Sequence, residues 1–511
     1  MLDLRFTSRR EPLTTSGLAA ATIFVLHLIA NPHYGYFRDE LYFIVCGFRP
    51  QFGYVDQPPG VPLLAAASQL FGHSLMALRA VPALFAGAAA GVAVLLTAEL
   101  GGKRFAQIST AIVVALTPVL MAFGGKVSTD EANPLLWTLA AYALLRALDD
   151  GGERWSLAAG AALGAAFETK YSVVFFAAAL LGGLLLTPER RIFTSRWFWA
   201  GTALALALAL PNALWQAAHG LPMLELLRAG QDGKNVIVGP LAYLAQQLLI
   251  TGIFIAPVWL VGLVQLGLTP RTRFLAWTFA LLIAAMIVFH GKHYYPAAIY
   301  PIPLAAGCVA LERWTERQRW TRPALAAALV AGGAVFVPFA LPVLPERAFI
   351  AYEARVQTAL GLKRSDLATE HHQGEPQLPP DWADMHGWPE LAATVEAVAA
   401  RLTPAERARA LVVTSNYGEA SALEFFGRDL PPVVSAHNQF WLWGVQGRSG
   451  DVVIDVNGDC GRSAHLFARA GLAATSNPAY AMTWERNVPI MVCRGIRTPL
   501  GTLWPSLKRY I

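Results

Sequence analysis

The chain has few charged residues for its length. Only 14% of its 511 residues are Asp, Glu, Lys or Arg, whereas 55% are hydrophobic. A soluble domain carries about 25% charged residues. Because the apolar residues form several long runs, the composition indicates a polytopic membrane protein. The net charge of +6 does not indicate nucleic-acid binding, since Lys and Arg fall in short clusters between these runs.

Cysteine is also scarce. No two of Cys46, Cys308, Cys460 and Cys493 form a CxxC pair, which argues against a zinc or thioredoxin-type site. Cys460 and Cys493 share the C-terminal region. They either pair, if that region lies outside the cytoplasm, or remain free buried thiols. The N-terminal region lacks a clear cleavage site after its first apolar run, so an uncleaved transmembrane helix is expected there.

The apolar runs predict about eleven membrane-spanning helices, since one span needs about 20 mostly apolar residues. No internal sequence repeat is visible, which argues against transporters built from duplicated halves. The candidate spans are residues 13–30, 75–98, 107–124, 133–148, 156–168, 171–187, 197–215, 240–266, 274–290, 296–311 and 323–343.

Basic residues gather in alternate connectors between these spans. With the N-terminus in the cytoplasm, the cytoplasmic connectors are mostly rich in Lys and Arg, as the positive-inside rule requires. The connector 149–155 fits less well, because Arg154 is its only basic residue. The remaining connectors lie outside and hold most of the unusual polar residues. The cytoplasmic group is 103–104, 149–155, 189–196, 271–273 and 312–322, and the outer group is 31–74, 124–132, 168–171, 216–239 and 291–295.

The composition changes after about residue 345. Residues 346–380 are polar and are expected to form a linker. Residues 381–511 contain short β-branched runs bounded by turn signals, which predict the buried strands of a small α/β domain outside the cytoplasm. The predicted fold class is therefore a polytopic α-helical membrane domain, residues 1–345, followed by a linker and a small soluble α/β domain.

Two adjacent acids, Asp39 and Glu40, follow the first apolar run. They are either a solvated pair or acids partly desolvated by neighbouring aromatic residues, which raises a carboxylate pKa toward that of a useful base. Arg38 supplies a counter-charge. In the next turn, shaped by Pro58 and Pro59, Asp56 either caps the following helix or contacts substrate.

Other outer connectors carry further acids and cations. Asp130 belongs either to an N-cap pattern or to a cavity shared with Asp39. Lys170 either pairs with Glu168 or binds phosphate. Lys292 offers a point charge suited to phosphate. Neighbouring Tyr294 and Tyr295 suit a membrane interface, and His290 and His293 are either metal ligands or hydrogen-bonded structural groups.

Together these residues suit a reaction in which a phosphate-linked lipid is the leaving group. A carboxylate would take the proton of an acceptor hydroxyl, and cations would stabilise the departing phosphate. The lipid tail would explain why the site is embedded in helices.

The motifs resemble glycosyltransferase family 39, the group related to dolichyl-phosphate-mannose protein mannosyltransferases and to the aminoarabinose transferase of lipid A. The combination is specific, although each motif alone is weak. The C-terminal motifs resemble the soluble tail of bacterial members. The matching stretches are Phe37–Tyr42, Gly53–Pro59, Ser128–Asp130, Thr169–Tyr171, Gly291–Pro296, Ala383–Trp388, Asn416–Ala420 and Ser435–Asn438.

The resemblance implies a GT-C membrane fold and an inverting transfer of sugar from a polyprenyl-phosphate donor to a glycan, lipid or protein acceptor. Asp39 would be the general base and Glu40 its positioning neighbour or a metal ligand, so a divalent metal is left open as a cofactor. Glu168 departs from the family pattern, where a neutral residue is expected. The implied catalytic residues are Asp39, Glu40 and Asp130, and the implied substrate-binding residues are Arg38, Tyr54, Asp56, Lys170, Lys292, His293, Tyr294 and Tyr295.

A transporter or flippase of a lipid-linked or anionic substrate is the alternative, because it would use the same lysines without chemistry. A third interpretation is a membrane-anchored binding protein whose C-terminal domain does the work. The outer domain and the acidic pair favour the enzyme. Its expected location is the bacterial inner (cytoplasmic) membrane, with a cytoplasmic N-terminus and an extracytoplasmic C-terminal domain.

Overall fold

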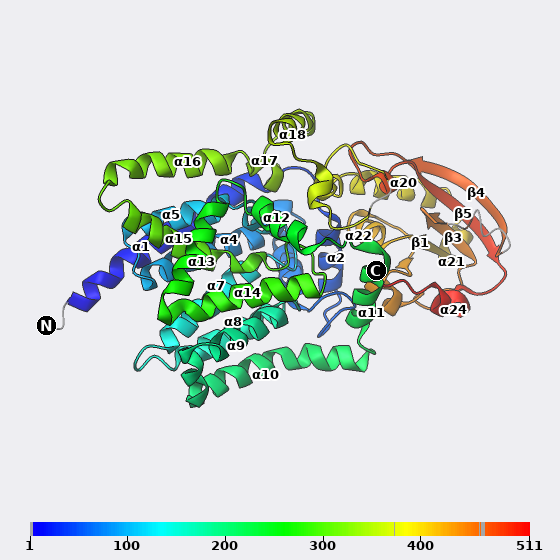
Figure 1. Ribbon diagram of the computed structural model, residues 1–511. Helices are drawn as coiled ribbons and strands as arrows, with labels where there is room; N and C mark the ends of the chain where they lie inside the picture. The colour runs from blue at the N-terminus through cyan, green and yellow to red at the C-terminus, as the bar shows by residue number, and fades with distance from the viewer. Residues whose placement is uncertain (1–3, 372–373, 459, 461–465) are drawn as a thin grey trace.

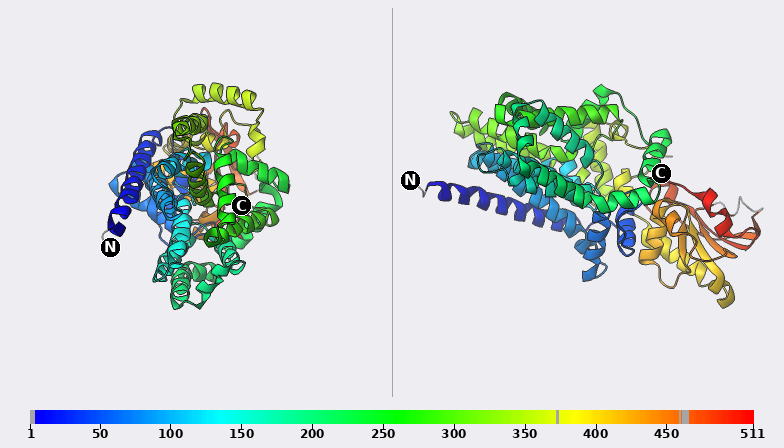
Figure 2. Two further views of the ribbon diagram at one scale, coloured as in Figure 1. Left: turned by 60° about the vertical axis from the view of Figure 1, so that its left-hand side comes forward. Right: turned by 90° about the horizontal axis from the view of Figure 1, so that it is seen from below.

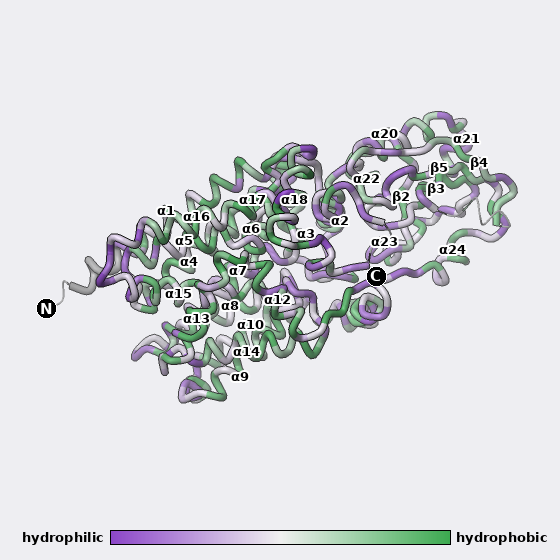
Figure 3. Tube along the Cα trace, turned by 45° about the horizontal axis from the view of Figure 1, so that its top comes forward, coloured by the Kyte–Doolittle hydropathy of each residue, from purple (hydrophilic) through white to green (hydrophobic). Residues whose placement is uncertain are grey.

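The computed structural model describes residues 4–371, 374–458, 460 and 466–511. The molecule is elongated, with a bundle of helices that carries a small sheet domain at one end (Figure 1). The N-terminus lies at the opposite end of the bundle, as the view from below shows (Figure 2, right). Hydrophobic residues dominate the bundle, and hydrophilic segments gather between the bundle and the sheet domain (Figure 3).

Every predicted span coincides with a helix or with a pair of helices. By length and apolar composition, four described helices are able to cross a membrane, or up to six if each bent pair is one span. The count of eleven spans therefore stays a prediction. The helices of the bundle are α1 (Leu4–Ala30), α4 (Leu75–Glu99), α5 (Arg104–Leu116), α6 (Pro118–Gly125), α7 (Asn133–Ala147), α8 (Trp155–Phe167), α9 (Val173–Leu185), α10 (Arg196–Ala218), α12 (Pro240–Ile250), α13 (Ala256–Leu268), α14 (Arg273–Val288), α15 (Pro301–Trp314), α16 (Arg322–Ala334) and α17 (Val337–Ala340).

Local sequence explains where one of these spans bends. Helices α5 and α6 meet at an angle of 65°. The residue between them, Thr117, is extended, with φ −70° and ψ 113°. It precedes Pro118, whose ring disfavours a helical conformation at the preceding residue and which lacks an N–H for the helical ladder. The break therefore follows from a single proline.

Glycines let the helices of the bundle approach closely. A Cβ atom on Gly262 of α13 would lie 1.8 Å from the carbonyl oxygen of Pro303 in α15. A Cβ on Gly307 of α15 would lie 2.0 Å from the carbonyl oxygen of Val258 in α13. Small residues at such crossings allow backbones to touch, which is a common way to pack helices in a membrane.

Some of the connectors that we expect on the cytoplasmic side contact one another. Arg271 lies 2.7 Å from a carboxylate oxygen of both Glu99 and Asp149. Glu312 accepts a hydrogen bond of 2.6 Å from the backbone N–H of Lys103. These contacts join four of the five basic connectors in two pairs, 149–155 with 271–273 and 103–104 with 312–322.

The C-terminal domain is a five-stranded mixed sheet in the order β2-β1-β3-β5-β4. Strand β1 is parallel to β2 and β3, and β5 is antiparallel to β3 and β4. Helices α20 and α22 pack against it. The element bounds are α20 (Trp388–Ala399), α21 (Pro404–Arg409), β1 (Ala410–Thr414), α22 (Tyr417–Phe426), β2 (Val433–Ser435), α23 (Asn438–Trp443), β3 (Val452–Val456), β4 (Phe467–Ser476), β5 (Val488–Ile496) and α24 (Leu500–Leu503).

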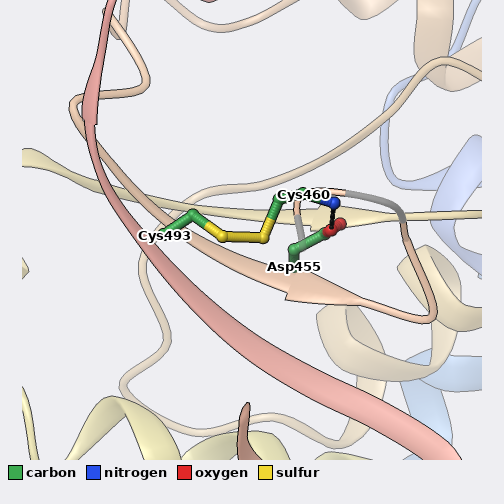
Figure 4. Close-up of a disulfide and its surroundings, with 3 residues drawn as sticks. All are labelled: Asp455, Cys460 and Cys493. Carbon is green, nitrogen blue, oxygen red and sulfur yellow. Dashed lines mark hydrogen bonds between the residues drawn. A yellow bond between two sulfur atoms is a disulfide. The ribbon is translucent and has the colours of Figure 1, made fainter. Parts of the chain in front are cut away.

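A disulfide joins Cys460, which follows β3, to Cys493 of β5 (Figure 4). The backbone N–H of Cys460 donates to the carboxylate of Asp455 over 2.8 Å. Of the two alternatives that the sequence leaves open, the paired one is therefore found. Cys46 and Cys308 are free and buried.

The segment 346–380, which we expect to be a linker, contains structured elements. Helix α18 (Glu346–Leu360) is followed by a short 3₁₀ turn at Arg364–Leu367. Arg364 forms an ion pair with Glu353 of α18, which fastens the turn to the helix. The chain then continues toward the junction of bundle and sheet domain, where Glu370 enters the site described next.

Candidate active site between the bundle and the sheet domain

Helix α2 (Arg38–Gly47) carries Asp39 and Glu40 in its first turn, and a hydrogen bond within that turn stabilises its start. Glu40 accepts a hydrogen bond of 2.8 Å from the backbone N–H of Phe37, which precedes the helix. The N-terminal end of a helix favours acids, because its free N–H groups carry partial positive charge. The adjacent acids Asp39 and Glu40 therefore suit a helix start, and the hydrophobic rest of α2 is buried.

Glu40 is enclosed by protein. Its side chain is 0% exposed and forms two hydrogen bonds with Arg79 of α4, of 3.0 and 2.8 Å. It also accepts a hydrogen bond of 3.0 Å from the backbone N–H of Val127. These contacts occupy both oxygens of the Glu40 carboxylate with protein donors. Among the described residues, no group of three or more His, Cys, Asp or Glu side chains is arranged to hold a metal ion.

Asp39 differs from Glu40 because its carboxylate is one-third exposed. Its Oδ1 atom accepts a 2.7 Å hydrogen bond from the hydroxyl of Tyr417, which belongs to the sheet domain. The Nε atom of Arg38 lies 3.6 Å from the same oxygen. Within the described chain no group donates to the other oxygen, Oδ2. One oxygen is thus anchored while the other is available.

Arg38 joins Asp39 to a second acid of the C-terminal region. Its guanidinium lies 3.5 Å from the carboxylate of Asp384 and 5.4 Å from the ring centre of Tyr417. Burial raises the pKa of Asp384 to about 6, although Arg38 works against the rise. Sequence reasoning identified Arg38 but not these two partners, even though each lies in a stretch that carries the family resemblance.

Asp130 and Lys170 are brought together from different connectors. Their ion pair measures 2.5 Å from Oδ2 to Nζ. Lys170 therefore pairs with Asp130 and not with Glu168, which corrects the pairing considered from sequence. The ammonium group also lies 5.2 and 4.5 Å from the ring centres of Tyr294 and Tyr295.

Lys292 has a partner that the sequence did not suggest. Glu370 lies 2.5 Å from Lys292 and 3.6 Å from Lys234. Backbone contacts hold this arrangement. The N–H of His371 donates a hydrogen bond of 2.8 Å to the carbonyl of Lys234, and Glu370 forms an isolated antiparallel β-bridge with Asn235. Burial raises the pKa of Glu370, but the two lysines lower it by more, and the net value is about 2.

A shallow pocket lies beside Lys292. Apolar side chains of α14 and the segment 236–238 form much of its wall, α12 contributes polar side chains, and Lys292 and His293 also line it. His293 is buried, and burial together with Lys292 lowers its pKa to about 4. A cation beside an apolar wall suits an amphiphile with an anionic head.

Asp56 and Tyr54 have structural contacts. Asp56 accepts hydrogen bonds from Tyr42, 3.0 Å, and from Asn438, 3.2 Å. Burial raises the pKa of Asp56 to about 6. Helix α3 (Gly60–Ser68) has no side-chain cap, so the capping alternative for Asp56 is wrong. Tyr54 is fully buried and donates to the carbonyl of Cys46 over 2.8 Å.

The capping alternative for Asp130 is also wrong, since helix α7 begins at Asn133 without a side-chain cap. Glu168, the departure from the family pattern, lies in the turn after α8. Burial raises its pKa to about 7. Its backbone carbonyl accepts a hydrogen bond of 2.8 Å from the N–H of Gly60. This bond links two of the connectors that we expect on the outer side.

Comparison with known proteins supports the resemblance drawn from the motifs. Residues 56–215 match the family model described as dolichyl-phosphate-mannose-protein mannosyltransferase. No curated protein matches the sequence. Two crystal structures of ArnT from Cupriavidus metallidurans are similar at 14% identity, and each comparison covers 93% of this chain and 97% of that one. The TM-score is 0.62 for the apo form and 0.61 for the form bound to undecaprenyl phosphate. The likeness shows that this chain has the GT-C membrane fold predicted from its sequence.

Proposed function

We propose that this GT-C membrane protein is an inverting glycosyltransferase that moves a sugar from a polyprenyl-phosphate donor to a hydroxyl of an envelope lipid, polysaccharide or protein. The observation that carries the proposal is a carboxylate with one free oxygen, Asp39, whose charge acts on Lys234, and Lys234 shares the partner Glu370 with Lys292. Burial lowers the pKa of Lys234, and Glu370 and Asp39 act against that change. The base and the cations therefore belong to one electrostatic site.

In the proposed reaction, Oδ2 of Asp39 accepts the proton of the acceptor hydroxyl. The hydroxyl oxygen forms a bond to the anomeric carbon as the bond from that carbon to the phosphate oxygen breaks. The electron pair leaves with the polyprenyl phosphate, whose charge is stabilised by Lys170 and Lys292. Attack from the side opposite the phosphate inverts the anomeric configuration.

The other residues implied by the resemblance support this arrangement. Asp130 holds Lys170, and Tyr294 and Tyr295 lie beside the same ammonium group. The apolar residues that line the pocket next to Lys292 offer a surface for the first part of a lipid tail. Lys234 and Glu370 join the donor site in this proposal.

We further propose that the site faces the outside of the bacterial inner membrane, with a cytoplasmic N-terminus. Four of the five basic connectors contact one another in two pairs, which supports a common cytoplasmic side under the positive-inside rule. The disulfide of the sheet domain suits an oxidising compartment. On this proposal residues 1–345 form the catalytic membrane domain, 346–380 the linker and 381–511 the extracytoplasmic domain.

The test uses Asp39→Asn in the purified full-length protein. A panel of radiolabelled undecaprenyl-phosphate hexoses and pentoses serves as donor, and envelope extract serves as acceptor. We expect the wild type to release undecaprenyl phosphate with one of these donors. Asp39→Asn should then lose at least about 100-fold in rate, because a general base contributes roughly 10²–10⁴-fold.

The matched control is Asp232→Asn, which neutralises an exposed acid of an outer connector. It should transfer sugar at the wild-type rate. Normal transfer by Asp39→Asn would overturn the assignment of the base. A wild type that moves the labelled lipid across vesicles without consuming any donor of the panel would overturn the enzyme in favour of a transporter.

A further inference from the structure

The start of helix α22 is built to lie against the start of helix α2. The side chain of Asn416 caps α22 by accepting 2.9 Å from the N–H of Glu419. A Cβ atom on Gly418 would lie 2.5 Å from Cγ of Arg38, so only glycine allows this approach. Tyr417, which lies between Asn416 and Gly418 in the sequence, is thereby placed beside Arg38 and Asp39.

The ring of Tyr417 is held from several sides. Its centre lies 4.6 Å from that of Tyr42 and 5.0 Å from that of His437. The side chain is buried, with 9% of its surface exposed. Burial keeps the pKa of Tyr417 well above its usual range, so its hydroxyl remains a hydrogen-bond donor. A buried phenol held this way presents its proton in one direction.

That direction is Oδ1 of Asp39. The hydrogen bond of 2.7 Å joins residues 378 positions apart in the sequence. A carboxylate with one oxygen bound can no longer rotate freely, and its free oxygen, Oδ2, keeps a fixed position. General-base catalysis requires such a fixed geometry, because the base must lie within hydrogen-bond reach of the proton that it accepts.

We infer that Tyr417 is a positioning residue for the proposed base, and that the C-terminal domain thereby completes the active site of the membrane domain. This inference rests on the proposed function. It assigns the sheet domain a part in the chemical step, in addition to any part in acceptor binding. Tyr417 itself does not touch the reacting atoms and acts through Asp39.

The test compares Tyr417→Phe with Tyr34→Phe in the full-length protein, using the donor identified by the panel above. Tyr34 donates a hydrogen bond of the same length, 2.7 Å, to the carbonyl of Leu344, away from Asp39. We expect Tyr417→Phe to lower kcat by about 10- to 100-fold, the range for loss of a hydrogen bond to a charged group. KM for the donor should change less than threefold, and Tyr34→Phe should keep both constants.

The pH profile separates positioning from structural support. A hydrogen bond donated to a carboxylate favours its ionised form. The acidic limb of the kcat profile should therefore move to higher pH in Tyr417→Phe and stay in place in Tyr34→Phe. In an Asp39→Asn background, adding Tyr417→Phe should change the residual rate less than twofold, because the group that it positions is already lost.

The outcomes distinguish this inference from the proposed function. If Asp39→Asn is inactive while Tyr417→Phe keeps the wild-type kcat and pH profile, the inference fails and the base assignment stands. If Asp39→Asn remains active, the base assignment itself fails. A second variant, difluorotyrosine at position 417, keeps the ring and makes the phenol a stronger donor. It should move the acidic limb to lower pH, and an unmoved limb would contradict the inference even if Tyr417→Phe did not fold.

Discussion

Neutralising Glu370 should strengthen the binding of a lipid phosphate. In the free protein its carboxylate pairs with Lys292 over 2.5 Å and with Lys234 over 3.6 Å. A donor phosphate that binds Lys292 must compete with this carboxylate. Glu370→Gln keeps the size of the side chain and removes its charge, so both lysines become available to the phosphate.

The magnitude follows from the pKa of Glu370, which is lowered from 4.5 to about 2. A shift of this size corresponds to about 3 kcal/mol of favourable interaction of the ionised form, at 1.36 kcal/mol per pH unit. Because the folded-state pKa is depressed, the interaction is fully present above pH 4.5 and is lost as the pH falls through about 2. At pH 7 the phosphate therefore competes with the whole of it.

We expect Glu370→Gln to lower the Kd of undecaprenyl phosphate by about tenfold, with about 100-fold as the ceiling that 3 kcal/mol allows. Water solvates the released lysines, which explains a gain below the ceiling. The assay is titration of the purified protein with undecaprenyl phosphate in detergent at pH 7, followed by intrinsic tryptophan fluorescence or calorimetry. Lys292→Met should weaken binding under the same conditions.

The control is Glu353→Gln, which removes the acid of another ion pair in the same segment, the one with Arg364. It should leave the Kd unchanged. If Glu370→Gln instead weakens binding as much as Lys292→Met does, the carboxylate orients the lysines for the phosphate. The reasoning that it competes with the phosphate would then be refuted.

Two further predictions concern stability. Arg79→Met should destabilise the protein by about 3–5 kcal/mol, because it leaves the buried carboxylate of Glu40 without its counter-charge. In thermal melts, Glu40→Gln combined with Arg79→Met should recover part of this loss. An unchanged Tm in Arg79→Met would contradict the prediction. The raised pKa of Asp56, about 6 against 3.8, favours the protonated folded state. The free energy of unfolding should therefore fall by about 2 kcal/mol between pH 4 and pH 6 on its account. Asp56→Asn should flatten that slope in melts recorded across this pH range, and a slope equal to that of the wild type would count against the assignment.

The helical part of the fold was predictable because its signal is local. Apolar runs of sufficient length mark the spans, and a helix or helix pair occupies each predicted range. Charge alternation also placed Asp39, Asp130, Lys170 and Lys292 at the same end of the bundle. The break at Thr117 is readable from the proline that follows it.

The pairing of these residues was not predictable from local sequence. The sequence suggests an ion pair of Lys170 with its neighbour Glu168, yet the partner of Lys170 is Asp130, 40 residues away. Glu370 belongs to a polar segment without periodicity, and nothing local connects it to Lys292. The pairing of Tyr417 with Asp39 depends on how the sheet domain seats on α2, and one sequence holds no signal for that arrangement.

The hydrogen bond between Tyr417 and Asp39 also has a consequence for biosynthesis. The two residues are 378 positions apart, and a chain grows by about 5–20 residues per second, so Tyr417 is made roughly 20 to 75 s after Asp39. During that interval the helices of the bundle enter the membrane while the base lacks its partner. On the proposed topology and the inferred role of Tyr417, the growing chain reaches full activity only after the sheet domain has been exported, has folded and has packed against the bundle. Chains released early would insert among the lipid-linked sugars of the membrane without consuming them at the normal rate.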